Sequence, residues 1–335
     1  MVSRLNDGDV IIEIEEVITS NKTERLKSKI CSSAEHGMIY GNSKLYHSSQ
    51  GNQQGGVRSH SVEHIFHNKC TLGEKLVFRI KNEEIRKNLI SIVTQWDPTR
   101  DAKIYEEAKK NKKSGRIILP TPFVNYRYRK KDVGNSEEIS QFELFRVFRA
   151  YTRNKEDKPL SKKKGVSCGN FVSYSIKAAI IQTLFPKGLP EAIREKYHFI
   201  EKKKTDTNRK LSNISLDEFK EFQDIVLKNL PNDQKEMGNI PLIELYNELC
   251  RAVKGYSIEE FCRHAFDHPA IWDFSGYVFY RDSSMKETWV MPHDIYLKFF
   301  KTFGRDHNMI VDDDELNAIG ISLENLNESK QINKK

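Results

Sequence analysis

Apolar and polar residues alternate over several short stretches of the chain, and this spacing predicts β-strands. Residues 10–15 read Val-Ile-Ile-Glu-Ile-Glu and follow turn residues, so we expect a strand there. Residues 36–48 predict a tight hairpin that turns near Asn42. Strand character returns at residues 76–80 and again over residues 272–300. The chain therefore contains enough strands to form an antiparallel sheet.

Helical spacing predicts two helices in the middle of the chain. Asn82 can cap the first helix, whose apolar stripe consists of Ile85, Leu89, Ile92 and Trp96. The second helix runs from Cys168 to about Leu184, and residues 190–268 look all-helical. The predicted fold class is α+β, with a small antiparallel sheet packed on the helix that begins at Cys168, plus a helical insertion.

These elements predict a division of the chain into parts. Residues 1–188 are expected to form a core, with an insertion at about 97–160. Residues 189–270 are expected to be a helical insertion or cap over the site. Residues 271–311 return to the core, and residues 312–335 form a flexible polar tail.

Composition limits the class of protein. The chain has 335 residues, of which 38% are hydrophobic, so it can bury a core. Its net charge of +8 favours anionic partners. No apolar run approaches the roughly 18 residues of a transmembrane helix, and residues 1–8 do not resemble a signal peptide. The five cysteines are scattered and odd in number, which argues against a disulfide framework and favours a reducing compartment.

The most informative stretch for chemistry surrounds Cys168. The sequence Gly165-Val166-Ser167-Cys168-Gly169-Asn170-Phe171 places a cysteine where a glycine-flanked loop becomes an apolar helix. The thiolate is the nucleophilic form of cysteine, and a helix N-terminus lowers the pKa of a thiol. This position suits a nucleophile, although a lone cysteine at a helix start is more often a buried structural residue.

Two histidines in the predicted hairpin supply the other groups that thiol catalysis needs. His36 opens one strand, where a base can face a nucleophile. His47 follows eleven residues later on the returning strand, where it can hydrogen-bond the ring of His36 and hold its tautomer. The alternative for His47 is a strand histidine that faces solvent.

Other candidate sites are weaker. Cys262, His264 and His268 have metal-like spacing, but such residues on a helix usually serve packing and surface, so no metal and no cofactor are expected. Lysine runs at 109–113, 162–164 and 202–204 are solvated loops or an anionic-substrate surface. The aromatic and basic stretch 123–129 reads as an exposed strand edge rather than a nucleic-acid surface. The His-rich segment 59–64 is interpreted as a helix start that packs under the hairpin.

Several motifs in a fixed order give the chain a family resemblance. They are Asp7-Gly8-Asp9-Val10-Ile11, Glu35-His36-Gly37-Met38-Ile39-Tyr40, Lys44-Leu45-Tyr46-His47, Gly56-Val57-Arg58 with Ser61-Val62-Glu63, Ser167-Cys168-Gly169-Asn170-Phe171-Val172 and Val290-Met291-Pro292-His293-Asp294-Ile295-Tyr296. This order resembles the circularly permuted papain-like cysteine enzymes. These include the YiiX-like hydrolases and the lecithin:retinol acyltransferase-like proteins of the NlpC-related superfamily. The resemblance covers about a third of the chain.

The resemblance implies roles for three residues. Cys168 would be the nucleophile, His36 the base and His47 the orienting residue of a thiol-dependent acyl-transfer enzyme. With water as acceptor the enzyme is a cysteine peptidase, amidase or deamidase, which we favour. With an amine as acceptor it is a lysine or lipid acyltransferase. A non-catalytic binding module with a basic surface is the alternative outside enzymes.

The expected partner is a protein or lipid that offers an acyl group, or an anionic surface, and nucleic acid is disfavoured. The Lys/Asn/Ile-rich composition and the acidic patch at 312–315, with Glu324 and Glu328, resemble effectors of intracellular pathogens exported by a type IV system. The expected location is therefore the cytoplasm, or a host cell reached by secretion without a signal peptide, where the substrate would be a host protein.

Overall fold

The structure is a computed structural model that describes residues 2–14, 23–49, 56–63, 74–97, 106, 110, 168–186, 224–225, 228–232, 258–281, 288–304 and 310–321. The chain divides into two compact units. Unit 1 comprises Met1–His47, Ser59–Lys81 and Ile258–Lys335, and unit 2 comprises Ser48–Arg58 and Asn82–Ser257. The predicted loop at 51–55, the insertion at 98–160 and the cap at 189–257 lie almost wholly outside the described residues.

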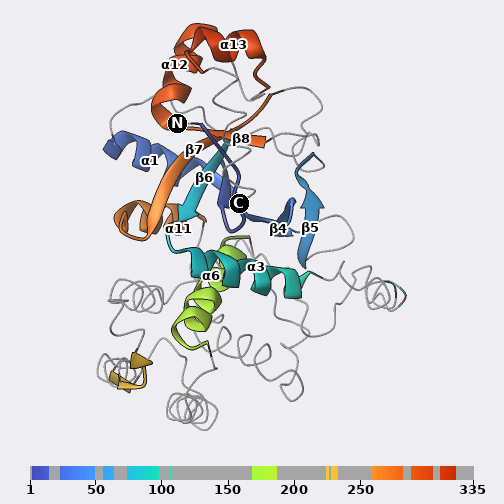
Figure 1. Cartoon of the computed structure of the whole chain (residues 1–335), viewed down its shortest axis with the longest axis vertical. Helices are drawn as coiled ribbons and strands as arrows, with labels where there is room; N and C mark the ends of the chain where they lie inside the picture. Colours follow the sequence, from blue (N-terminus) through green and yellow to red (C-terminus); the bar gives the residue numbers. More distant parts are fainter. Residues whose placement is uncertain are drawn as a thin grey trace. The chain divides into compact units, whose positions relative to one another are not determined.

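An antiparallel sheet of eight strands organises the described chain (Figure 1). The spatial order is β1-β8-β7-β6-β2-β3-β4-β5. The strands are β1 (Ser3–Arg4), β2 (Val10–Ile14), β3 (Ala34–Gly41), β4 (Lys44–Ser49), β5 (Gly56–Ser61), β6 (Glu74–Ile80), β7 (Trp272–Tyr280) and β8 (Thr288–Met291). The prediction of a mixed α/β fold with an antiparallel sheet is confirmed, but the sheet is larger than the small one expected.

Strand β2 lies inside the sheet, between β6 and β3, and all five of its residues are buried. Burial extends to Glu13, which the alternating sequence pattern would have placed toward water. Glu13 stands opposite Lys75 of β6, and the Lys75 Nζ lies 4.0 Å from a Glu13 carboxylate oxygen. Burial lowers the pKa of Lys75, and the charges of Glu13 and Glu74 partly offset this effect. The pair places one positive and one negative charge within the sheet.

The predicted hairpin is confirmed as β3 and β4, and its turn explains its register. Asn42 and Ser43 have φ values of 51° and 59°, the left-handed pair found in two-residue type I′ turns. The Asn42 backbone N–H also donates to Oδ1 of Asp7, at 2.9 Å. The register that follows pairs Ile39 with Tyr46. This register decides which side chains of the two strands share a face.

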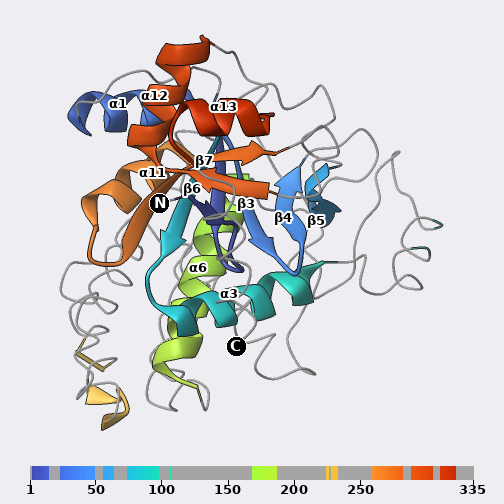
Figure 2. The same ribbon diagram turned by 45° about the horizontal axis from the view of Figure 1, so that its top comes forward.

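Three helices pack in unit 1, on one side of the sheet (Figure 2). They are α1 (Thr23–Ser33), α11 (Ile258–Asp267) and α12 (His293–Phe303). Phe78 of β6 lies against Phe261 and Phe266 of α11, with ring centroids 6.0 and 5.3 Å apart. Helix α11, which lies within the predicted cap at 189–270, belongs to unit 1 together with most of the sheet.

The end of the described chain is folded where a flexible tail was expected. Helix α13 (Asp313–Ala318) begins with a capping box in which Asp312 and Glu315 exchange hydrogen bonds. Leu316, Ile319 and Ile321 are buried. The tail prediction from 312 is wrong up to residue 321, because a strong cap and three apolar contacts hold this segment; residues 322–335 lie outside the described part.

The strand character expected over residues 272–300, through 278–280 and 288–290, is found in β7 and β8, but α12 begins at His293. Pro292 cannot donate a backbone hydrogen bond and precedes the helix, and Gly304 ends it in the left-handed conformation, with φ 60°. Pro292 thus marks the start of the helix and Gly304 marks its end, although the apolar pattern alone did not predict a helix here.

Unit 2 contains α3 (Glu83–Trp96) and α6 (Cys168–Leu184), which pack against each other. Both helices have the predicted bounds. A side-chain hydrogen bond joins them, from Nδ2 of Asn88 to Oγ1 of Thr183 at 2.8 Å. Along α3 the predicted stripe is buried at Ile85, Leu89 and Ile92.

The predicted cap of α3 provides a stability test. The Oδ1 of Asn82 accepts from the Ile85 backbone N–H at 3.0 Å. We expect Asn82→Ala to lower the free energy of unfolding by about 1 kcal/mol, measured by urea denaturation followed by circular dichroism. Asn82→Asp is the control, because it keeps an acceptor and adds a charge that suits a helix N-terminus. Equal losses in both variants would contradict the capping role.

Candidate functional site

The three predicted site residues lie on three elements. His36 is on β3 and His47 is on β4, both in unit 1. Cys168 is the first residue of α6, in unit 2. The structure therefore brings the two histidines together within one unit, while Cys168 belongs to the other unit.

His36 and His47 hydrogen-bond each other directly. The Nε2 of His36 lies 2.9 Å from Nδ1 of His47, and the rings meet edge to face at 88°. The register of β3 and β4 places the two rings diagonally on one face of the sheet, within reach of each other. The predicted contact between the two rings is confirmed. His47 is only 7% exposed, so the alternative of a solvent-facing histidine is wrong.

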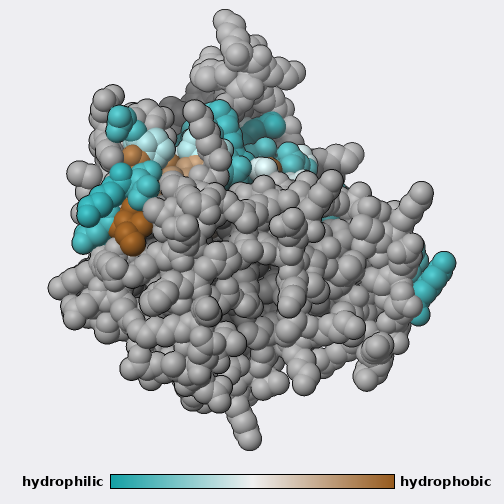
Figure 3. Space-filling model, turned by 90° about the horizontal axis from the view of Figure 1, so that it is seen from below, coloured by the Kyte–Doolittle hydropathy of each residue, from teal (hydrophilic) through white to brown (hydrophobic). Residues whose placement is uncertain are grey.

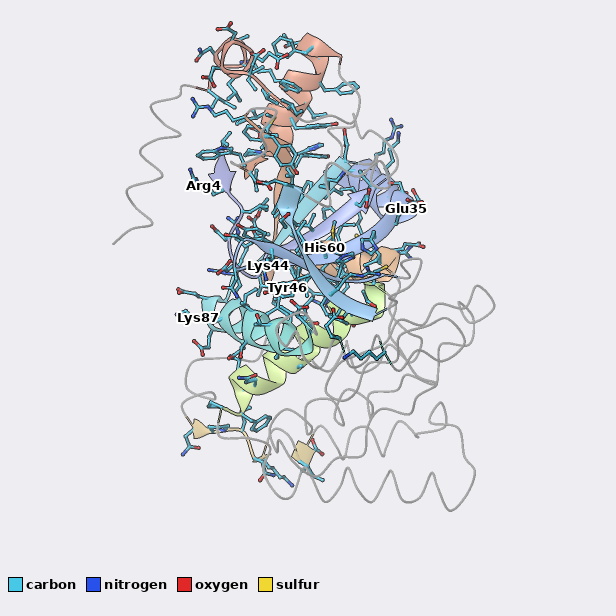
Figure 4. The ribbon with its side chains drawn as sticks, turned by 90° about the vertical axis from the view of Figure 1, so that its right-hand side faces the viewer. Arg4, Glu35, Lys44, Tyr46, His60 and Lys87 are labelled. Carbon is cyan, nitrogen blue, oxygen red and sulfur yellow. The ribbon has the colours of Figure 1, made fainter. Side chains whose placement is uncertain are left out.

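A third histidine, which the sequence analysis did not assign to the site, continues this contact. The Nε2 of His47 lies 2.9 Å from Nδ1 of His60, and the ring centroids are 5.1 Å apart. His60 lies on β5, the strand next to β4. Figure 4 labels His60 together with Tyr46 of β4. We call His36, His47 and His60 the histidine chain.

The interpretation of residues 59–64 as a helix start is wrong for residues 59–61, which belong to β5. The sequence held one usable signal. The Gly/Gln/Asn-rich segment before Val57 is a turn signal that fits the start of a third strand beside the hairpin. The contact itself depends on the pairing of β4 with β5, which local sequence does not specify.

Acidic and basic groups stand beside the histidine chain. Glu13 of β2 is the cross-strand partner of His36, so both side chains lie on the same face. Lys75 lies beyond Glu13 on β6, and both charged residues are buried. A carboxylate next to an imidazole favours the protonated ring. This end of the sheet thus places an imidazole, a carboxylate and an ammonium group on three neighbouring strands.

The Asp7–Asp9 motif has a structural role at the other end of β2. Gly8 has φ 90°, and its N–H donates to the Tyr40 carbonyl at 2.9 Å. Asp9 is fully buried and binds Arg79 through both carboxylate oxygens, at 2.8 Å each. This arrangement ties the start of β2 to β3 and β6, and so fixes the strand that carries Glu13.

Cys168 occupies a position that suits a reactive thiol. It begins a helix of 17 residues, is half-buried and forms no disulfide. The positive end of the helix dipole favours a thiolate there. The rest of α6 is anchored by buried residues, among them Phe171, Val172 and Ile176. The cysteine is therefore held at the end of a rigid element.

The other described thiols have inert environments. Cys31 of α1 and Cys262 of α11 are buried. Burial raises the pKa of Cys31, and it raises the pKa of Cys262 well above the usual range. Cys70 and Cys250 lie outside the described residues. Cys168 is thus distinguished from Cys31 and Cys262 by both exposure and position.

The weaker candidates receive no support from geometry. The rings of His264 and His268 are tilted by 43° to each other, with centroids 4.3 Å apart. Within the described ranges, no three His, Cys, Asp or Glu side chains are grouped so as to hold a metal ion. The lysine runs at 109–113 (apart from Lys110), 162–164 and 202–204, and the aromatic stretch 123–129, lie outside the described residues.

The fold and site define a mixed α/β protein with an eight-stranded antiparallel sheet and a hydrogen-bonded histidine chain. No family model matches the sequence, and neither curated proteins nor solved structures include a significant match. Among the helices that the structure describes, none is both long and apolar enough to span a bilayer. On the described part of the face in Figure 3, hydrophilic residues predominate and a few smaller apolar areas lie beside them.

Proposed function

We propose that the protein is a thiol-dependent acyl-transfer enzyme, with Cys168 as nucleophile, His36 as base and His47 as orienting residue. The observation that carries the proposal is the 2.9 Å hydrogen bond between His36 and His47. A base held by a second polar group is what nucleophilic thiol catalysis requires. The same proposal includes the fold: a permuted papain-like core, in which the sheet packs on the Cys168 helix.

The chemistry follows from which nitrogen is engaged. Nε2 of His36 is hydrogen-bonded to His47. The other ring nitrogen of His36, Nδ1, would therefore take the proton from Cys168. The sulfur keeps the electron pair, attacks an amide or ester carbonyl carbon and forms an acyl-enzyme, while His36 returns the proton to the leaving group. The backbone N–H of Cys168, at the start of α6, would donate to the oxyanion. Water then releases the acyl group, or an amine accepts it.

Selective alkylation of Cys168 tests the proposed thiol chemistry. Iodoacetamide should label Cys168 before Cys31 and Cys262, as measured by peptide mass spectrometry over time. We expect His36→Ala to slow labelling of Cys168 about 100-fold at pH 6, where an ordinary thiol of pKa about 8.5 is less than about 1% ionised. His268→Ala is the matched control, since it removes a half-exposed histidine outside the histidine chain. Equal labelling of all cysteines, or no effect of His36→Ala, would contradict the proposal.

A generic acyl donor tests the acyl-transfer step itself. Incubation with p-nitrophenyl acetate should add one acetyl group to Cys168 and none to a Cys168→Ala variant. Release of the acetyl group by water supports the hydrolase, which we favour. Faster release by an added lysine methyl ester supports the acyltransferase. A crystal structure with the Cys168 sulfur more than about 10 Å from the His36 ring would contradict both, because direct proton transfer needs hydrogen-bond reach.

A further inference from the structure

We propose that His60 is a positioning residue, which fixes the tautomer of His47 and thereby presents Nδ1 of His36 as the basic nitrogen. The inference deepens the proposed function, because it names how the base of that site is prepared. It rests on the histidine chain, in which three adjacent strands each contribute one ring. His60 acts through His47 and is therefore not itself a catalytic residue.

The geometry allows only two ordered states of the neutral chain. Both ring nitrogens of His47 lie 2.9 Å from a ring nitrogen of a neighbour. In a neutral imidazole one nitrogen donates and the other accepts. If His47 donates from Nε2 to His60, its Nδ1 must accept from Nε2 of His36. If His47 donates from Nδ1 instead, both hydrogen bonds reverse.

The first state leaves His36 ready to act as a base, and the second does not. In the first state each ring carries its hydrogen on Nε2, which is the tautomer that an isolated neutral imidazole prefers. Nδ1 of His36 then carries a lone pair rather than a hydrogen, which is the form that can take up a proton. In the reversed state Nδ1 of His36 already carries a hydrogen. An acceptor at His60 therefore selects the state in which His36 can accept a proton.

The charges around the chain favour a neutral His60, whose Nδ1 can accept a hydrogen bond, over a protonated His60, whose Nδ1 can only donate. Glu13 faces His36, with Lys75 beyond it, and this carboxylate favours positive charge on the His36 ring. Arg58 lies two residues before His60 on β5 and so shares its face, which disfavours a second positive charge there. His47, between them, is 7% exposed, and a charge on a buried ring is costly.

The proton step then balances along the chain. The hydrogen of the Cys168 thiol moves to Nδ1 of His36, and the sulfur becomes a thiolate. His36 becomes an imidazolium whose Nε2–H still donates to Nδ1 of His47. His47 and His60 stay neutral and keep their hydrogens on Nε2. The positive charge thus remains beside Glu13 and the thiolate.

Imidazole ¹⁵N chemical shifts test this inference without any activity assay. In the full-length, ¹⁵N-labelled protein at a pH where the rings are neutral, we expect the Nε2–H tautomer at both His36 and His47. His60→Ala should convert His47 to a mixture of tautomers. His60→Asp should restore the Nε2–H form, because a carboxylate oxygen at the δ position accepts a hydrogen bond and has no hydrogen to donate. An Nδ1–H tautomer in the wild type, or no change in His60→Ala, would overturn the inference.

Alkylation separates this inference from the proposed function. We expect His60→Ala to slow iodoacetamide labelling of Cys168 about tenfold, the effect of losing one hydrogen bond, and His60→Asp to restore most of the rate. If wild-type Cys168 is not labelled selectively, the proposed function fails while the tautomer result still decides the role of His60. Selective labelling that His60→Ala leaves unchanged would overturn the positioning role instead.

Discussion

Replacing Gly276 with alanine is expected to lower the free energy of unfolding by about 4 kcal/mol or more. Gly276 has φ 126°, a conformation that other residues rarely adopt. A Cβ at this position would lie 2.0 Å from the Met291 carbonyl oxygen and 2.9 Å from Cα of Pro292. These are backbone atoms of β8 and its end, so no rotamer change can relieve the clash.

The clash lies on β7, which pairs with β6 on one side and with β8 on the other. Gly276 is next to a bulge in the β6–β7 pairing, and Tyr277 pairs with Met291 across β7 and β8. Relief would require the two strands to separate. Because small domains are stable by only about 5–15 kcal/mol, a large fraction of Gly276→Ala should be unfolded at 37 °C. Circular dichroism melting curves would measure this loss.

Gly304→Ala is the matched control for this prediction. Gly304 also has positive φ, 60°, but a Cβ there would meet nothing within 4 Å. Only the left-handed backbone conformation disfavours alanine there, so Gly304→Ala should lower the free energy of unfolding by about 1 kcal/mol. Similar melting temperatures for the two variants would show that a Cβ at position 276 does not clash with the Met291 backbone.

Asp9→Asn is expected to lower the free energy of unfolding by about 3 kcal/mol, because it leaves the positive charge of Arg79 without its carboxylate. Asp9 is fully buried, and the Arg79 side chain is 18% exposed. Burial of Arg79 opposes its charge, but the hydrogen bonds and charge of Asp9 outweigh burial, so the pKa of Arg79 is raised. Asparagine can accept a hydrogen bond but cannot balance the guanidinium.

Two comparisons make the Asp9 prediction specific. The double variant Asp9→Asn/Arg79→Met removes the uncompensated charge and should recover part of the lost stability. Glu83→Gln breaks a solvent-exposed pair with Lys87, whose atoms lie 3.0 Å apart, and should leave urea denaturation unchanged. A loss in Asp9→Asn no greater than in Glu83→Gln would show that the buried pair contributes nothing.

Local pattern was enough to predict the elements that carry the site. The hairpin follows from a turn sequence that tolerates positive φ at Asn42, and α3 follows from its cap and apolar stripe. Spacing along the hairpin also predicted the contact between His36 and His47, since strand pairing brings residues on facing strands together. Each of these inferences uses residues close together in the chain.

The sequence pattern did not predict the contacts between segments that lie far apart in the chain. Helix α12 and the fold of residues 310–321 depend on caps and on burial against partners far along the chain. Glu13 reads as an exposed strand position, yet β6 and β3 enclose β2 and bury it. A sequence pattern reports which residues can be buried, but not how many strands will flank them.

The sequence by itself determined an α+β chain with a histidine hairpin and a cysteine at a helix start, because hydrophobic period and turn chemistry act over a few residues. Only the tertiary structure decided that β5 pairs with β4 and adds His60 to the histidine chain. It also decided that Gly276 must be glycine, through the approach of Met291. Strand order and close backbone approach depend on long-range packing, which no local pattern encodes.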